Sequence, residues 1–245
     1  LNAIASGIPD HLRLMVLDLA DSPMLTRLAD LYPDAVITIE PDLDMMTAII
    51  QMASAGDPAH PGVKFRKAFV ALSQAATKKD IPRFEQLAIE PLGIAREEKW
   101  KHLEVAVYAL KGSTLLSVKK YKEALAVYED ARRIAQSAAD QGDPTGQILA
   151  LQMLLCKGSS GIAMNDYKLA AEQYALAGDK AEEAGDSFQL MEARRMQGYC
   201  LEQLRDKPGA WDAYLLSLDA GEKLDESMRK SSTLPYVAKS LLVLA

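Results

Sequence analysis

The sequence predicts an all-α protein in which helical hairpins stack into a solenoid. Residues 121–143 are repeated twice further along the chain: Ala124 is followed by Ala170 after 46 residues and by Ala210 after another 40. Self-similarity at a period of 20–50 residues is typical of repeat arrays. Ala and Leu dominate a composition that is 49% hydrophobic and only 6% aromatic, which favours helices over sheets.

The first 60 residues form an acidic N-terminal segment with nine acids and two bases, and they carry essentially all of the net charge of −6. Residues 12–20 and 35–39 have a β-like composition, and helices are expected at 22–32 and 42–55. Two interpretations stay open. One is a small β-α-β-α cap with one or two short strands, and the other, which we favour, is a mostly helical segment with one extended link.

A linker rich in Pro and Gly at 56–62 separates this segment from the array, which we place at 63–245. Residues 63–99 are interpreted as a degenerate first repeat, with a second helix that begins at Pro82. Pro91 lies inside that second helix. We expect it to break or kink the helix, because proline lacks an amide N–H and its ring clashes with the preceding turn.

Three clearer hairpins follow, at residues 100–142, 146–185 and 187–226. Each has a Gly in its first helix, an Ala twelve residues later and a Tyr four residues after that: Gly112, Ala124 and Tyr128; Gly158, Ala170 and Tyr174; Gly198, Ala210 and Tyr214. We expect the Gly to let the second helix approach, with the Ala facing it and the Tyr one turn further along. Gly142 and Gly185 are expected to end the second helices of the first two hairpins.

These residues resemble the tetratricopeptide repeat (TPR) family. Its signature is a small residue in helix A, an Ala early in helix B, an aromatic four residues on, and then a small residue, here Ala131, Ala177 and Ser217. The period of roughly 40 residues is similar to the extended variant of kinesin light chains and bacterial peptide-sensing regulators. The resemblance implies a right-handed superhelical solenoid of antiparallel hairpins. It covers 100–245 well, 63–99 weakly and 1–60 not at all, and Arg194 departs from its pattern.

The resemblance also implies where a partner binds, because in that family helix A lines a concave face. The first copy contributes Ala106, Ala109, Ser113 and Leu116. The expected partner-binding set comes from the next two copies: Gln152, Leu155, Ser159, Ile162, Glu192, Arg195, Tyr199 and Glu202. This set suits a helix or extended peptide with apolar anchors and a charged end. The same positions could instead pack on the next hairpin, and that alternative stays open.

No motif indicates catalysis, a metal or a cofactor. Residues 111–114 lack the upstream Gly and the strand of a phosphate loop, and no histidine has a second ligand at helical spacing. A magnesium site formed by the acids at 18, 21, 40 and 42 depends on the β-α-β-α interpretation, and helix caps explain the same acids more simply. We therefore expect a protein that is not an enzyme and that holds no cofactor or metal.

The expected function is a non-catalytic protein- or peptide-binding scaffold or adaptor. The net charge of −6 argues against direct binding to nucleic acid. No run approaches the ~18 apolar residues of a membrane span. Cys156 and Cys200 are expected to be buried free thiols, which indicates a cytoplasmic protein. The alternative is a sensor or regulatory arm of a larger signalling, transcriptional or catalytic protein, whose other domain lies outside or overlaps residues 1–60.

The sequence given ends in an apolar stretch, 234–245, which we interpret as helix A of a partial final repeat at 232–245. Its last residues, 241–244, are Leu, Leu, Val and Leu, and terminal repeats of an array need a polar outer face. Either the chain continues past Ala245, which we favour, or this helix packs against a second copy to form a homodimer.

Overall fold

The structure is a computed structural model of the chain, and it describes residues 61–224 together with 237, 240 and 241. In this part the chain is all-helical, with eight helices and no strand. The predicted all-α fold is therefore confirmed for the described residues. The segment 1–60, with its two interpretations, lies outside them.

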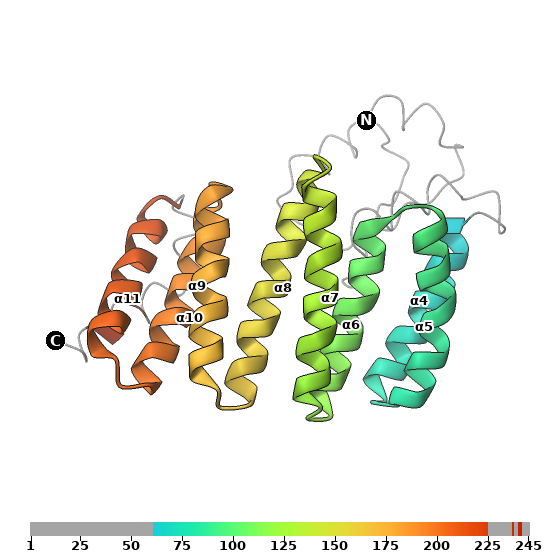
Figure 1. The fold of residues 1–245 in the computed structure, drawn as a ribbon, viewed down its shortest axis with the longest axis horizontal. Coiled ribbons are helices and arrows are strands. Elements are labelled where there is room, and N and C mark those ends of the chain that lie inside the picture. Colours follow the sequence, from blue (N-terminus) through green and yellow to red (C-terminus); the bar gives the residue numbers. More distant parts are fainter. Residues whose placement is uncertain (1–60, 225–236, 238–239, 242–245) are drawn as a thin grey trace, which may run out of the picture.

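The helices form four antiparallel hairpins in a row (Figure 1). Their bounds are α4 (Pro61–Thr77) with α5 (Ile81–Glu97), α6 (Lys101–Ser117) with α7 (Tyr121–Ala139), α8 (Pro144–Ala163) with α9 (Tyr167–Glu183), and α10 (Ser187–Gln203) with α11 (Lys207–Glu222). Each helix packs mainly on the helices before and after it in sequence, and α6 also contacts α4 and α8. This nearest-neighbour packing is that of a helical solenoid.

The four turns inside the hairpins share one backbone conformation. Each contains a residue with φ between 57° and 65°, at Lys79, Lys119, Asn165 and Arg205. A non-glycine residue tolerates this left-handed conformation as a single residue at modest cost. Figure 1 shows all four turns along the same edge of the array.

Helix starts and ends follow the expected capping chemistry. Asp80, Asp166 and Asp206 precede α5, α9 and α11, and the side chain of each accepts a backbone N–H of the first turn. Gly142 and Gly185 follow α7 and α9 with φ of 85° and 70°, the helix-ending role predicted for them.

The repeat glycines make room for the repeat tyrosine rings. A Cβ built on the glycine would approach the nearest ring atom to 2.5 Å for Gly112 and Tyr128, 2.8 Å for Gly158 and Tyr174, and 2.7 Å for Gly198 and Tyr214. Real Cβ atoms essentially never come that close to another heavy atom, so these three positions need glycine. All nine repeat residues are buried.

In the second copy the nearest neighbour of the repeat glycine is the tyrosine ring and not the alanine that we expected to face it. Ala170 lies against Gly161 instead, where an added Cβ would sit 2.9 Å from the Ala170 backbone N and 3.0 Å from its Cβ. The reason is steric. The ring of Tyr174 occupies the space over Gly158, so the close alanine contact falls three residues, about one turn, further along α8.

We expected Pro91 to break or kink its helix, and the structure shows no break there. α5 runs without interruption from Ile81 to Glu97 with Pro91 inside it. Proline removes one backbone hydrogen bond, but the Pro91 ring is fully buried in the array. Burial of that apolar ring offsets part of the loss.

The described residues after α11 pack on the last hairpin. Val237 and Leu241 are buried and pack with Ala210 and Tyr214. Residues 242–244 lie outside the described residues, so the expected homodimer contact stays a prediction. In the part of the chain that the structure describes, no helix is both long and apolar enough to cross a membrane.

Candidate partner-binding face

Helices α8 and α10 carry matching rows of accessible side chains, which we call the α8–α10 face. Its residues are Ile148, Gln152, Leu155, Ser159 and Ile162 on α8, and Phe188, Glu192, Arg195, Tyr199 and Glu202 on α10; none of them is buried. Alternating steps of four and three residues keep each row on one side of its helix. All eight predicted partner-binding residues therefore lie on this face, together with two that the prediction did not include.

The α8 half is mainly apolar. Leu155 and Ile162 are partly buried and pack on the cluster of Ala170, Ala171, Tyr174 and Cys200. Gln152 and Ser159 are exposed. Leu155 and Ile162 thus contribute to the core and also leave part of their surface in solvent. The alternative that the predicted binding positions only pack inside the array therefore holds for these two residues in part.

The α10 half is charged and aromatic. The guanidinium of Arg195 donates to the carboxylate of Glu192 at 2.8 Å, and both side chains are about a quarter exposed, at 26% and 22%. The ring of Tyr199 meets that of Tyr167 edge-on, with ring centroids 6.3 Å apart. Tyr167, at the start of α9, therefore extends the face, and the predicted partner-binding set did not include it.

The repeat tyrosines reach this face through their hydroxyl groups. Tyr174 Oη lies 3.0 Å from Ser159 Oγ, and Tyr214 Oη donates to Glu202 Oε2 at 3.0 Å. Burial raises the pKa of Tyr214 to about 12 and also raises that of Tyr174, while the positive charge of Arg195 opposes both shifts. The sequence analysis gave these tyrosines only a packing role, because a sequence does not show that a ring packs inside while its hydroxyl group reaches the surface.

Ile148 and Phe188 are the clearest residues that the prediction missed. They lie at equivalent repeat positions forty residues apart, one turn before Gln152 and Glu192. Ile148 is 58% exposed and Phe188 is 38% exposed. The signal was available, since each is a large apolar side chain near the start of a helix A, but the family-derived contact positions begin one turn later.

The corresponding positions of the first copy are not buried either, but three of their four side chains, Ala106, Ala109 and Ser113, are small. Ala109 and Leu116 of α6 pack against the core cluster that includes Ala124 and Tyr128. Ser113 is exposed, but its hydroxyl donates to a backbone carbonyl of its own helix, that of Leu110, at 2.9 Å. The first copy therefore presents less side-chain surface for binding a partner than α8 and α10 do.

A charged joint links the second hairpin to the third. Glu129 of α7 accepts from Arg132 of the same helix at 2.7 Å and from Lys157 of α8 at 2.8 Å. These bonds lower the pKa of Glu129 to about 2 although partial burial acts in the opposite direction. The joint fixes α8, and hence one half of the face, against the preceding hairpin.

The described residues contain no group of three or more His, Cys, Asp or Glu side chains placed to hold a metal ion. Cys156 and Cys200 are free thiols, and burial raises the pKa of Cys200 to about 11 and also raises that of Cys156. Thiols that stay protonated at neutral pH are poor nucleophiles. These two cysteines pack as small apolar side chains.

Comparison with known proteins adds evidence on the fold alone. No protein-family model matches the chain, and no curated protein sequence matches it. Among solved structures it is similar to BtubC (BKLC) from P. vanneervenii, with a TM-score of 0.60 and 15% sequence identity. The alignment covers 91% of this chain and 84% of that one. At this identity the likeness shows a shared helical architecture.

Proposed function

We propose that the chain is a non-catalytic scaffold or adaptor of the tetratricopeptide type, which binds a protein or peptide across the α8–α10 face. The observation that carries the proposal is the exposure of Ile148 and Phe188, both large apolar residues at one end of the face, continued by Tyr199, which is 36% exposed. Burying apolar and aromatic surface of this kind is the main source of affinity in peptide complexes.

The chemistry of the face fits a ligand with apolar anchors and a charged group. Tyr174 of α9 connects the two halves of the face, since its hydroxyl lies 3.0 Å from Ser159 Oγ of α8 and the positive charge of Arg195 of α10 acts on it. The row from Ile148 to Ile162 spans ~21 Å, which is the length of six or seven residues of an extended peptide. A strand or helix laid across both helices would meet the apolar and the charged half at once.

The polar groups of the face are already held in place. Arg195 is fixed by Glu192, Tyr214 by Glu202, and Tyr174 by Ser159. A side chain that is ordered before binding loses less entropy when the partner arrives. Arg195 also keeps further N–H donors for a partner carboxylate or carbonyl.

The test is a peptide selected against the full chain from a displayed random library, with its affinity measured by calorimetry. The double variant Arg195→Ala/Tyr199→Ala is expected to weaken binding at least tenfold and to leave the melting temperature nearly unchanged, since both side chains are partly exposed.

The matched control is Arg133→Ala/Trp211→Ala, which removes an exposed Arg and an aromatic with the 36% exposure of Tyr199 from helices B. Equal affinity of the two double variants for the selected peptide would contradict the proposal.

We also propose a cytoplasmic location. Two free cysteines, one of them fully buried, fit a compartment that keeps thiols reduced.

A further inference from the structure

The edge that holds the four turns inside the hairpins is rich in positive charge. We call it the basic edge: Lys78, Lys79, Lys119, Lys120, Lys122, Lys168, Arg205 and Lys207. Figure 1 shows that the turns α4–α5, α6–α7, α8–α9 and α10–α11 lie on this side, so bases far apart in sequence share one edge of the array. The chain as a whole has a net charge of −6, which makes this concentration of cations a local feature.

The carboxylates of the basic edge are already engaged. Asp80, Asp166 and Asp206 accept backbone N–H groups at 3.0 to 3.1 Å as helix caps. Glu123 pairs with Lys120 at 3.2 Å. Within the described residues, the other seven bases of the edge make no ion pair. They remain available to an anionic partner.

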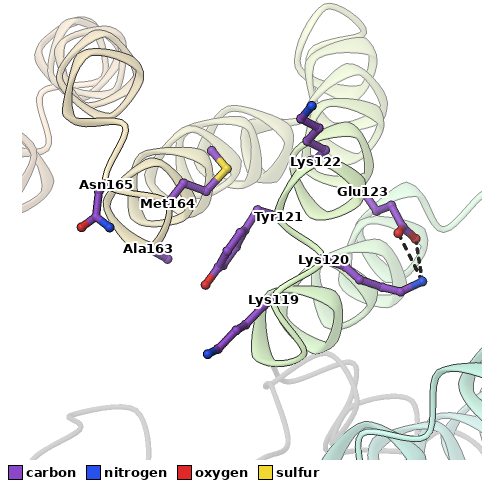
Figure 2. A pocket seen from close by; sticks show the side chains of 8 residues that line it. All are labelled: Lys119, Lys120, Tyr121, Lys122, Glu123, Ala163, Met164 and Asn165. Atoms are coloured by element: carbon purple, nitrogen blue, oxygen red, sulfur yellow. Dashed lines mark hydrogen bonds and ion pairs between the residues drawn. The ribbon is translucent and has the colours of Figure 1, made fainter.

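A pocket of about 500 Å³ opens in the middle of this edge, between the α6–α7 and α8–α9 turns. Figure 2 shows the ring of Tyr121 between Lys119 and Met164, while Lys120 turns away to meet Glu123. Tyr121, Ala163 and Met164 give the pocket an apolar wall. Lys119, Lys122 and Asn165 supply its polar rim.

Two comparisons within the chain explain why the pocket is open and positive here. Lys120 stands at the position that an aspartate holds before α5, α9 and α11, so this turn has gained a cation where the others have a carboxylate. Tyr167, at the repeat position of Tyr121, is covered by the ring of Tyr199. Within the described residues, Tyr121 has no such aromatic partner.

We propose that this pocket and the basic edge dock an acidic segment of a protein partner. An apolar side chain of that segment seats against Tyr121 and Met164, and flanking carboxylates pair with Lys119 and Lys122. A pocket that takes a side chain favours a peptide over a lipid surface. The net charge of the molecule opposes an extended polyanion such as nucleic acid. The residues that line this pocket include none of those of the α8–α10 face.

The experiment measures fluorescence anisotropy of a labelled peptide that carries glutamates on both sides of one leucine, added to the full chain. A peptide with glutamine in place of each glutamate is the neutral comparison. The variant Lys119→Glu/Lys122→Glu is expected to weaken binding about tenfold, because two attractions become repulsions. Raising the salt from about 50 to about 300 mM is expected to weaken wild-type binding.

The control variant Lys64→Glu/Lys67→Glu makes the same change of charge at two exposed positions of α4. It is expected to bind the acidic peptide nearly as well as wild type, and Arg195→Ala/Tyr199→Ala is expected to bind it equally well. An acidic peptide that does not bind, or that binds both charge variants alike, overturns the proposal. Lysine-dependent binding of phosphatidylserine vesicles or of an oligonucleotide, without peptide binding, overturns it as well.

Discussion

Each repeat tyrosine links the fold to the proposed site through the two ends of its side chain. The ring of Tyr174 fills the notch left by Gly158, and its hydroxyl bonds Ser159 on the accessible side of α8. Tyr214 repeats the arrangement with Gly198 and Glu202. Packing and surface chemistry are therefore coupled at these positions, since a change that moves the ring also moves the hydroxyl.

We predict that Gly158→Ala lowers the free energy of unfolding by about 1–3 kcal/mol, because the new methyl would lie 2.8 Å from the Tyr174 ring. The control is Gly93→Ala in α5, where an added Cβ meets nothing within 4 Å. That variant should gain up to about 1 kcal/mol from better helix propensity. Urea denaturation checks both, and opposite signs are expected. Equal midpoints for the two variants would contradict the close contact between glycine and tyrosine.

Arg194 is the residue that departs from the repeat pattern, and the structure shows how the array accommodates it. It is buried, pairs with Asp179 and donates to Gln197 at 3.0 Å, while Gly178 leaves space for its guanidinium. Its Nε has no hydrogen-bond partner. The preceding copy has an apolar residue, Leu154, at the equivalent position. Burying the charged Arg194 there instead costs desolvation free energy.

The stability test at this position is Arg194→Leu, which restores the residue type of the preceding copy. We expect an unfolding free energy equal to or above wild type, because a buried ion pair often contributes no more than well-packed apolar groups. Arg194→Ala should instead lose about 2 kcal/mol or more through the cavity it leaves. Thermal unfolding distinguishes the two. A leucine variant as unstable as the alanine variant would show that the ion pair itself stabilises the array.

At the scale of elements, helix order and bounds follow from the sequence because local chemistry determines them. Asp caps, left-handed turn residues and Gly stops act within a few residues, so a reader of the sequence can place them. Pro91 could not be predicted in this way. Whether a proline breaks a helix depends on what its ring packs against, and that is a contact between distant residues.

The charged contact of Glu129 that links α7 to α8 predicts how the stability of the protein depends on pH. The pKa of Glu129 is lowered to about 2, so its stabilising effect is complete above its unfolded value near 4.5 and is lost as the pH falls towards 2. Glu129→Gln should cost roughly 1–3 kcal/mol at pH 7 and almost nothing near pH 2. Denaturant unfolding of both proteins across this range measures the difference. An E129Q deficit that persists near pH 2 would contradict this role.

At the scale of the molecule, the repeat signal predicted the array, whereas the full composition of its surfaces needed the structure. The eight residues expected at the face lie on one side of α8 and α10, because helical periodicity is readable from sequence. Ile148 and Phe188 were missed because the family-derived contact positions begin one turn later, and Tyr167 was missed because its contact with Tyr199 joins residues far apart in the chain. The basic edge was missed for the same reason: it gathers bases that are about forty residues apart in the chain.

Hydrogen exchange of the full chain with its selected peptide shows whether the α8–α10 face binds the partner. Bound peptide should slow exchange in α8 and α10, with little change in α4 and α5. The protection should disappear in Arg195→Ala/Tyr199→Ala and remain in Arg133→Ala/Trp211→Ala. Protection confined to helices B, or protection that survives in the Arg195/Tyr199 variant, would contradict the account.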